Sequence, residues 1–168
     1  MINVLNGFLL LYFAVFFGVA VAWRTYRVWR ATGINAFRLR EESGPEAITG
    51  GYFKLLPVGA LALLLLVTLW PDLYGQLGVI ALLEIPLLQM AGVALMLLAL
   101  AWTILAQVQM GQSWRIGIDH DNCTALVTAG IFRYSRNPIF VGMMGSLAGL
   151  FLVLPCALSL LIFALAVV

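Results

Sequence analysis

Charged residues are scarce in this chain. They make up 10% of its 168 residues, whereas 64% are hydrophobic. A soluble domain carries roughly 25% charged and about 45–50% apolar residues. Because so little charge cannot cover a water-facing surface, the composition excludes an ordinary soluble protein. The formal net charge is only +2, too small to indicate a nucleic-acid partner.

Cysteine and histidine are also rare. Two cysteines, Cys123 and Cys156, are too few for a disulfide framework. Cys156 lies in an apolar run, where we expect it to pack as a small side chain. The single histidine, His120, stands between Asp119 and Asp121 without a second histidine or a cysteine cluster, so we expect no metal site. His120 and Cys123 would make a reactive pair, but the pattern favours a solvated loop.

Long hydrophobic segments dominate the rest of the chain. A helix needs about 20 apolar residues to cross the hydrocarbon core of a bilayer, which is about 30 Å thick. Three segments reach this length: residues 4–23, 52–70 and 87–108. The first lacks a basic start and a cleavage site, so we expect an anchor rather than a cleaved signal peptide. Beyond Pro138 the two apolar segments are shorter: residues 139–154 and 156–168.

These segments predict the fold class. It is all-α, a polytopic transmembrane helix bundle with about five membrane segments: three full spans and a C-terminal helical hairpin broken at Pro155. The length suits one domain rather than two. We interpret Gly44-Pro45 and Gly50-Gly51 as turns before the second span, because glycine and proline mark turns.

The basic residues predict the orientation of the bundle. All nine fall around two connections, after the first and the third span: Arg24, Arg27, Arg30, Arg38, Arg40, Lys54, Arg115, Arg133 and Arg136. The connection of residues 71–86 contains no basic residue, and its only charged residues are Asp72 and Glu84. Since cytoplasmic loops carry the excess of lysine and arginine, we expect the N-terminus outside and both basic loops in the cytoplasm. A bacterial inner membrane suits this multi-pass topology.

The stretch WRTYRVWR, residues 23–30, combines basic and aromatic side chains. Three arginines recur every three residues beside three aromatic residues: Arg24, Arg27, Arg30, Trp23, Tyr26 and Trp29. This pattern suits a helix that continues into the headgroup region, with aromatic anchors and arginines that meet anionic lipids. It also suits arginines that only mark the cytoplasmic side, the simpler interpretation. Both interpretations stay open.

A second polar group precedes the C-terminal apolar run. Asn137 suits a helix N-cap, because its side-chain oxygen accepts from a free amide of the first turn. Pro138 suits the first helical position. A helix start attracts anions, and Arg133 and Arg136 add positive charge, so this is either an anion site or a capped helix with snorkelling arginines. Three glycines in this helix predict close packing against another helix: Gly142, Gly145 and Gly149.

The segment LVTAGIFRYSRNPIFVG, residues 126–142, resembles a known family motif. The family is that of isoprenylcysteine carboxyl methyltransferases and their phospholipid methyltransferase-like relatives. Its motif places arginine-histidine-proline-x-tyrosine-x-glycine shortly after leucine-valine-threonine, a small residue, glycine, a hydrophobic residue and an aromatic residue. The segment MGQSWRIGID, residues 110–119, is similar to bacterial members. The resemblance implies an integral membrane transferase that uses S-adenosyl-L-methionine to methylate a lipophilic acceptor or a small thiol, carboxylate or amine.

The resemblance also implies a cofactor site at the cytoplasmic face. Carried over by motif, the residues that line the cofactor are Thr124, Ala125, Leu126, Val127, Phe132, Asn137, Pro138, Ile139 and Phe140. Arg136 is a further candidate, because its charge can pair with the methionine carboxylate of the cofactor. The expected partners are membrane lipids and a lipophilic methyl acceptor, without nucleic acid or metal. No catalytic residue is assigned.

The sequence departs from the family in three places. Asn137 replaces the usual histidine and cannot titrate, and Phe140 replaces the usual tyrosine and has no hydroxyl. Family members also continue into a polar helix with a glutamate, which completes the cofactor pocket, whereas this sequence stops at Val168. Thirteen helical residues from 156 to 168 span about 20 Å, short of the roughly 30 Å hydrocarbon core. We therefore expect residues 1–168 to be a single membrane-embedded methyltransferase-like domain that lacks its polar tail.

Two other functions stay open. Sterol reductases carry a similar arginine-histidine-proline-x-tyrosine motif and use NADPH, although their chains are longer and cross the membrane more often. A non-catalytic membrane scaffold is the other alternative. The sequence has no glycine-rich loop after a strand, which excludes a Rossmann-type methyltransferase domain.

The predicted orientation is testable by labelling. With Cys123 and Cys156 replaced by serine, a single cysteine placed within residues 71–86 should react with an impermeant maleimide added from outside. Cysteines at Gly44 or Gln112 should stay unlabelled until the membrane is opened. The opposite pattern would reverse the assignment of both basic loops.

Overall fold

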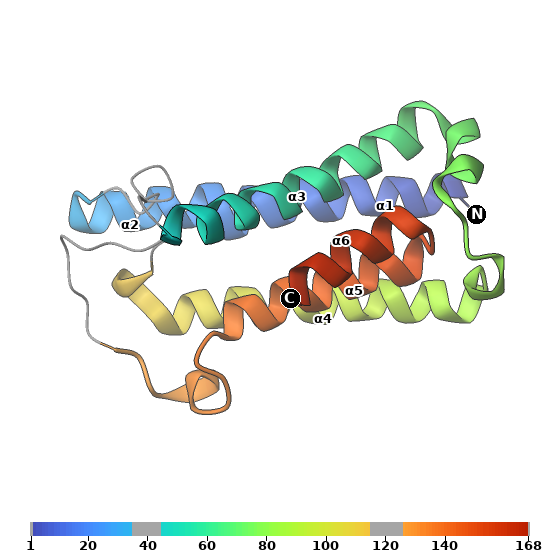
Figure 1. Cartoon of the computed structure of the whole chain (residues 1–168). Helices are drawn as coiled ribbons and strands as arrows, with labels where there is room; N and C mark the ends of the chain where they lie inside the picture. The colour runs from blue at the N-terminus through green and yellow to red at the C-terminus, as the bar shows by residue number, and fades with distance from the viewer. Residues whose placement is uncertain (1, 35–44, 115–125, 168) are drawn as a thin grey trace.

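The computed structural model describes residues 2–34, 45–114 and 126–167 (Figure 1). These residues form helices and turns; among them there is no strand, only an isolated antiparallel bridge between Val79 and Cys156. The all-α prediction is therefore confirmed for the described residues. In chain order the α-helices are α1 Ile2–Val15, α2 Arg24–Thr32, α3 Pro45–Leu69, α4 Pro86–Met110, α5 Pro138–Val153 and α6 Ala157–Val167.

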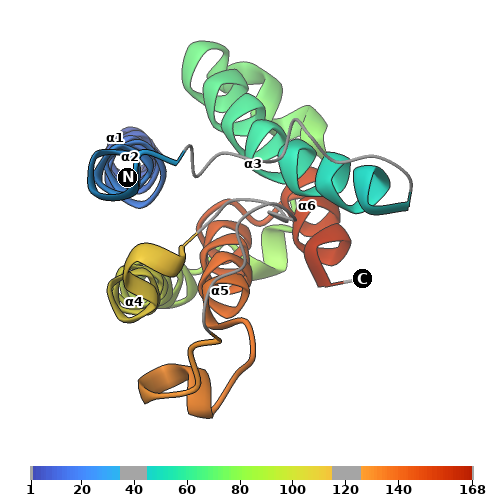
Figure 2. The ribbon, with the colours of Figure 1, turned by 90° about the vertical axis from the view of Figure 1, so that its left-hand side faces the viewer.

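Shorter helical segments connect these helices. A π-helical segment, η1 Phe16–Trp23, joins α1 to α2, so that one helix runs from Ile2 to Thr32. The 3-10 turns are η2 Pro71–Leu77, η3 Ala81–Leu83, η4 Gly111–Ser113 and η5 Gly130–Arg133. Seen end-on in Figure 2, α5 lies between α4 and α6, and α6 also lies beside α3.

Most of each apolar segment predicted from the sequence lies in a helix. Among the described residues, two helices are long and apolar enough to cross a membrane, judged by length and composition: Leu5–Thr32 and Pro86–Met110. The other apolar helices are shorter: Leu55–Leu69, Pro138–Val153 and Ala157–Val167. These findings agree with a membrane protein, while the count of about five membrane segments stays a prediction.

One predicted turn is wrong. Helix α3 begins at Pro45 and continues through Gly50 and Gly51, which therefore do not form a turn. Glycine inside a helix costs only about 1 kcal/mol relative to alanine, and packing of the apolar residues that follow offsets such a cost. Pro45 starts the helix, as its fixed φ favours; Gly44 lies outside the described residues.

Helices α4 and α5 approach each other through glycine. A Cβ atom on Gly92 would lie 2.7 Å from the carbonyl oxygen of Gly149, and one on Gly149 would lie 2.8 Å from the carbonyl oxygen of Gly92. Towards the start of α5, a Cβ atom on Gly142 would clash with Oγ1 of Thr103. Backbone therefore meets backbone at this interface, and the predicted packing role of the α5 glycines is confirmed.

The N-terminal helix joins this pair in the core. The hydroxyl groups of Tyr12 in α1 and Ser146 in α5 lie 2.6 Å apart and form a buried hydrogen bond. Around it, side chains from α1, α3, α4 and α5 are almost fully buried: Leu9, Leu63, Leu64, Met96 and Leu150. Helices α1, α3, α4 and α5 thus share one apolar core.

The hairpin between α5 and α6 breaks at Pro155, as predicted. The carbonyl oxygen of Pro155 accepts a hydrogen bond from Ile80 N at 2.8 Å, and Ala157 N donates to Gly78 O at 3.0 Å. The apex of the hairpin is thereby held by the connection between α3 and α4. Cys156 is fully buried there, which confirms its predicted packing role, whereas Cys123 lies outside the described residues.

The close approach of α4 and α5 predicts a specific sensitivity to one methyl group. Gly149→Ala should lower the free energy of unfolding by about 1–3 kcal/mol, because the added Cβ forces the helices apart. Gly7→Ala in α1 is the matched control: no atom lies within 4 Å of its added Cβ, so stability should stay equal or rise. Thermal unfolding in detergent measures both, and equal effects would show that the glycine contact contributes nothing.

Candidate functional site

The candidate site is built on the first turn of α5. Asn137 adopts a non-helical conformation, with φ −134° and ψ 72°, and its Oδ1 accepts a hydrogen bond from Phe140 N at 3.3 Å. Pro138 occupies the first helical position. Both halves of the predicted helix start are therefore confirmed, because asparagine caps a free amide and proline has no amide to leave unpaired.

Two side chains of α4 hold the segment that leads into α5. Trp102 donates from Nε1 to the carbonyl oxygen of Pro138 at 2.9 Å. Gln109 accepts from Ile131 N through Oε1 at 2.8 Å. At Gly130 the backbone takes φ 64°, and a Cβ atom there would clash with the side-chain amide of Gln109. Since only glycine fits both constraints, the tight turn at η5 depends on this residue.

The predicted cofactor residues differ widely in exposure. Pro138 is buried, whereas Arg136 and Asn137 are exposed. Leu126 is 87% exposed, in the segment that Figure 1 shows looping away from α4 and α5. Intermediate exposure is shared by Val127, Phe132, Ile139 and Phe140. The first turn of α5 thus gathers part of the predicted set, while Thr124 and Ala125 lie outside the described residues.

A polar contact at the same end of the bundle was not predicted. Arg24 donates from Nη2 to the carbonyl oxygen of Gln107 at 2.7 Å and to that of Gly111. Gln107 in turn donates from Nε2 to the carbonyl oxygen of Ala20 at 2.7 Å. Arg24 therefore caps the end of α4 from another helix. The signal in the sequence was Gln107, a polar residue within an apolar span.

A small apolar cluster connects this contact to the start of α5. Val28 of α2 and Trp114, which follows η4, are each 2% exposed. Met110 and Ile139 pack against them. The end of α4, one face of α2 and the first turn of α5 therefore meet in one place.

Metal chemistry finds no support among the residues that the structure describes. In those residues no group of three histidine, cysteine, aspartate or glutamate side chains is placed to hold a metal ion. The segment that carries Asp119, His120, Asp121 and Cys123 lies outside them, so the predictions about it stay predictions.

Comparison with known proteins gives one match. Residues 87–168 match a family described as phospholipid methyltransferase. The matched range covers nearly all of α4 together with η4, η5, α5 and α6, which are the elements that carry the candidate site. No curated protein and no solved structure matches the chain. The family match confirms the resemblance found in the motif.

The helix start predicts a measurable cap. Asn137→Ala should lower the free energy of unfolding by about 1 kcal/mol, because the amide of Phe140 loses its acceptor. Asn137→Ser retains an acceptor oxygen and should recover most of this loss. Denaturant unfolding in detergent checks both variants. If alanine and serine gave the same loss, a role of Asn137 other than the cap would account for it.

Proposed function

Because residues 87–168 match the phospholipid methyltransferase family, we propose that the chain is an integral membrane methyltransferase that uses S-adenosyl-L-methionine. The acceptor is a lipophilic molecule that reaches the enzyme from the bilayer. We place the cofactor at the start of α5, on the cytoplasmic side. The proposal includes about five membrane segments and the N-terminus outside.

The observation that carries this proposal is the capped, cationic start of α5. The amide of Phe140 is taken by Asn137 and Pro138 has none, which leaves the amide of Ile139 without an intrahelical partner. The positive end of the helix dipole points the same way and favours an anion. Arg136 precedes the cap and is exposed. A carboxylate such as that of the cofactor's methionine moiety fits these donors.

The remaining candidate residues suit the apolar parts of the cofactor. Phe132 and Phe140 have intermediate exposure, so each offers a ring to a planar base. Thr124, Ala125, Leu126 and Val127 complete the set that we propose from the motif. Asn137 and Phe140, which replace histidine and tyrosine of the family motif, provide capping and apolar contact rather than proton transfer.

For methyl transfer, the main task of this chain is to position the cofactor and the acceptor. The cofactor supplies an activated methyl group. The chain's own residues bind the cofactor by its carboxylate, orient it and keep the reacting atoms in line with the acceptor. The fixed contact of Trp102 with Pro138 supports this role, because it holds the helix start that carries the proposed donors.

A small apolar recess offers a contact for the end of an apolar acceptor. It lies between α1, α3 and α5 and is lined by Tyr12, Phe13, Phe16, Phe17, Leu56, Pro57, Met143, Ser146 and Leu147. Nearly all its walls are hydrocarbon or aromatic. Its volume is only about 30 Å³, so it admits a methyl or methylene group and not a whole chain. Burial of one such group gains about 0.8 kcal/mol, which favours an apolar acceptor over a polar one.

Cofactor binding tests the proposal. In calorimetry the protein should bind S-adenosyl-L-methionine or its demethylated product, and Arg136→Ala should weaken that binding by roughly 10- to 150-fold, the equivalent of about 1.5–3 kcal/mol for a charge-assisted hydrogen bond. Arg136→Lys should recover part of the loss. Asn137→Asp should keep the cap but repel the carboxylate.

The matched control is Arg30→Ala, an exposed arginine of α2 outside the proposed site. It should bind the cofactor like the parent protein. Equal binding by the Arg136 and Arg30 variants would contradict the proposed site. Tight binding of NADPH without binding of the methyl donor would instead favour a reductase, and binding of neither would favour a non-catalytic scaffold.

A further inference from the structure

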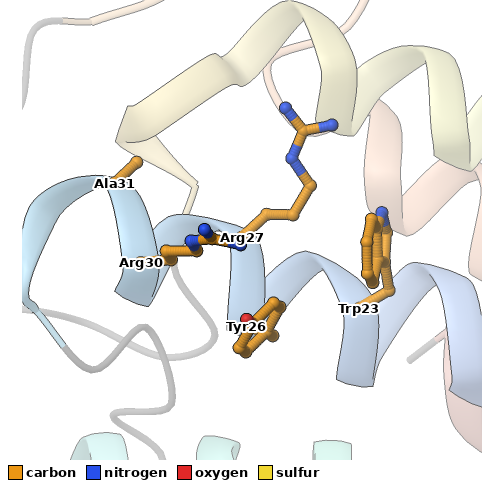
Figure 3. Close-up of a pocket in the computed structure, with 5 residues that line it drawn as sticks. All are labelled: Trp23, Tyr26, Arg27, Arg30 and Ala31. Carbon is orange, nitrogen blue, oxygen red and sulfur yellow. The ribbon is translucent and has the colours of Figure 1, made fainter.

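Helix α2 carries an open recess that the proposed methyl transfer does not use. The recess measures about 390 Å³ and is lined by Trp23, Tyr26, Arg27, Arg30 and Ala31. Figure 3 shows the side chains of Trp23 and Arg27 rising from the same side of the helix. Their spacing explains this, since residues four apart lie one above the other on a helix. Tyr26 and Arg30 form the neighbouring row by the same rule.

The adjoining face of α2, about 100° around the helix axis, is fixed to the bundle. Val28 is buried against Trp114, and Arg24 caps the end of α4. In contrast, Trp23 is 55% exposed and Tyr26 is 44% exposed. Large aromatic rings exposed on a rigid support are a costly arrangement in water but a favourable one at a membrane interface, where Trp and Tyr concentrate.

Arg27 and Arg30 are also available for a ligand. Both are exposed, and within the described part of the chain neither forms an ion pair or a side-chain hydrogen bond. Arg24 has a structural task, whereas these two do not. Two neighbouring arginines with unpaired guanidinium groups favour a phosphate group, because the planar fork matches its oxygens.

The position of α2 along the helix places the recess at headgroup level. The apolar part of the first helix runs from Leu5 to Trp23, 19 residues, which at about 1.5 Å per residue is roughly 28 Å, close to the thickness of a hydrocarbon core. The next two turns therefore enter the headgroup layer. The recess begins where the hydrocarbon ends.

From these observations we propose that the α2 recess binds the headgroup of an anionic phospholipid. Arg27 and Arg30 donate to the phosphate oxygens, while the rings of Trp23 and Tyr26 pack against the glycerol and the first carbons of the acyl chains. This inference does not rest on methyl transfer, and it places a lipid at a second position, apart from the start of α5.

The test measures lipid binding without cofactor. The full chain, purified in a neutral detergent, is titrated with phosphatidylglycerol, phosphatidylcholine and inorganic phosphate and followed by native mass spectrometry. We expect phosphatidylglycerol to bind most tightly and free phosphate to give no saturable binding. Arg27→Gln and Arg30→Gln should each weaken the binding of phosphatidylglycerol about fivefold, and the double variant about 30-fold, from about 1 kcal/mol per arginine.

Two matched controls distinguish binding at the recess from non-specific attraction by exposed charge or exposed apolar surface. Arg133→Gln removes one exposed arginine outside the recess, and Trp29→Ala removes one exposed aromatic residue of α2 that does not line it. Both should bind phosphatidylglycerol within about twofold of the parent, whereas Trp23→Ala should weaken binding as much as one arginine variant. The variants at Trp23, Arg27, Trp29 and Arg30 should still bind S-adenosyl-L-methionine, so failure here is distinguishable from failure of the proposed enzyme.

Three outcomes would overturn the inference. One is equal affinity for phosphatidylglycerol and phosphatidylcholine. Another is a loss of affinity in Arg133→Gln that matches the loss in Arg27→Gln, which would mean attraction by net charge alone. The third is tight binding of inorganic phosphate that competes with the lipid, which would make the recess a site for a soluble anion.

Discussion

The backbone contact between α4 and α5 is the constraint on which the rest of the fold depends. Gly92 and Gly149 bring two carbonyl groups within reach of the facing helix, and this distance leaves room for no side chain. Because the helices are so close, Trp102 of α4 reaches the carbonyl oxygen of Pro138, and Gln109 reaches the amide of Ile131. The position of the candidate site therefore follows from glycine spacing in the middle of the bundle.

The N-terminal helices reach the matched domain by polar contacts as well as apolar ones. Tyr12 meets Ser146 in the core, and Arg24 meets the end of α4. A hydrogen bond in an apolar surrounding requires a defined geometry. Breaking it is costly, because the polar group is then left with neither a partner nor water. These two contacts therefore fix the register of the first helix, which apolar packing alone would leave free to slide.

Much of this architecture could be predicted from the sequence. Hydropathy predicted the helices, Pro155 the break of the hairpin, and Asn137 with Pro138 the start of α5, because each is a local property of the chain. Gly50 and Gly51 were misread, since a local turn signal cannot show what the surrounding helix gains by packing. The task of Arg24 was also missed, because its acceptors lie more than 80 residues away. The motif predicted a set of cofactor residues. Among the described members of that set, contacts that fix their position are seen only near the first turn of α5, where Asn137 caps the helix and Trp102 bonds to Pro138.

The π-helical segment Phe16–Trp23 determines how the two ends of the first helix face. A π-turn bonds each residue to the fifth before it and so contains more residues than an α-turn. Each residue of an α-helix advances the side chains by about 100° around the axis, so an inserted residue changes the angular phase between everything before it and everything after it. With this segment in place, Tyr12 faces α5 and Arg24 faces α4. In a uniform α-helix of the same length, the angle about the axis between these two side chains would be different. The π-helical segment therefore sets a fixed rotational offset between the two ends of the first helix. A change in its number of residues would alter that offset even if the segment stayed apolar.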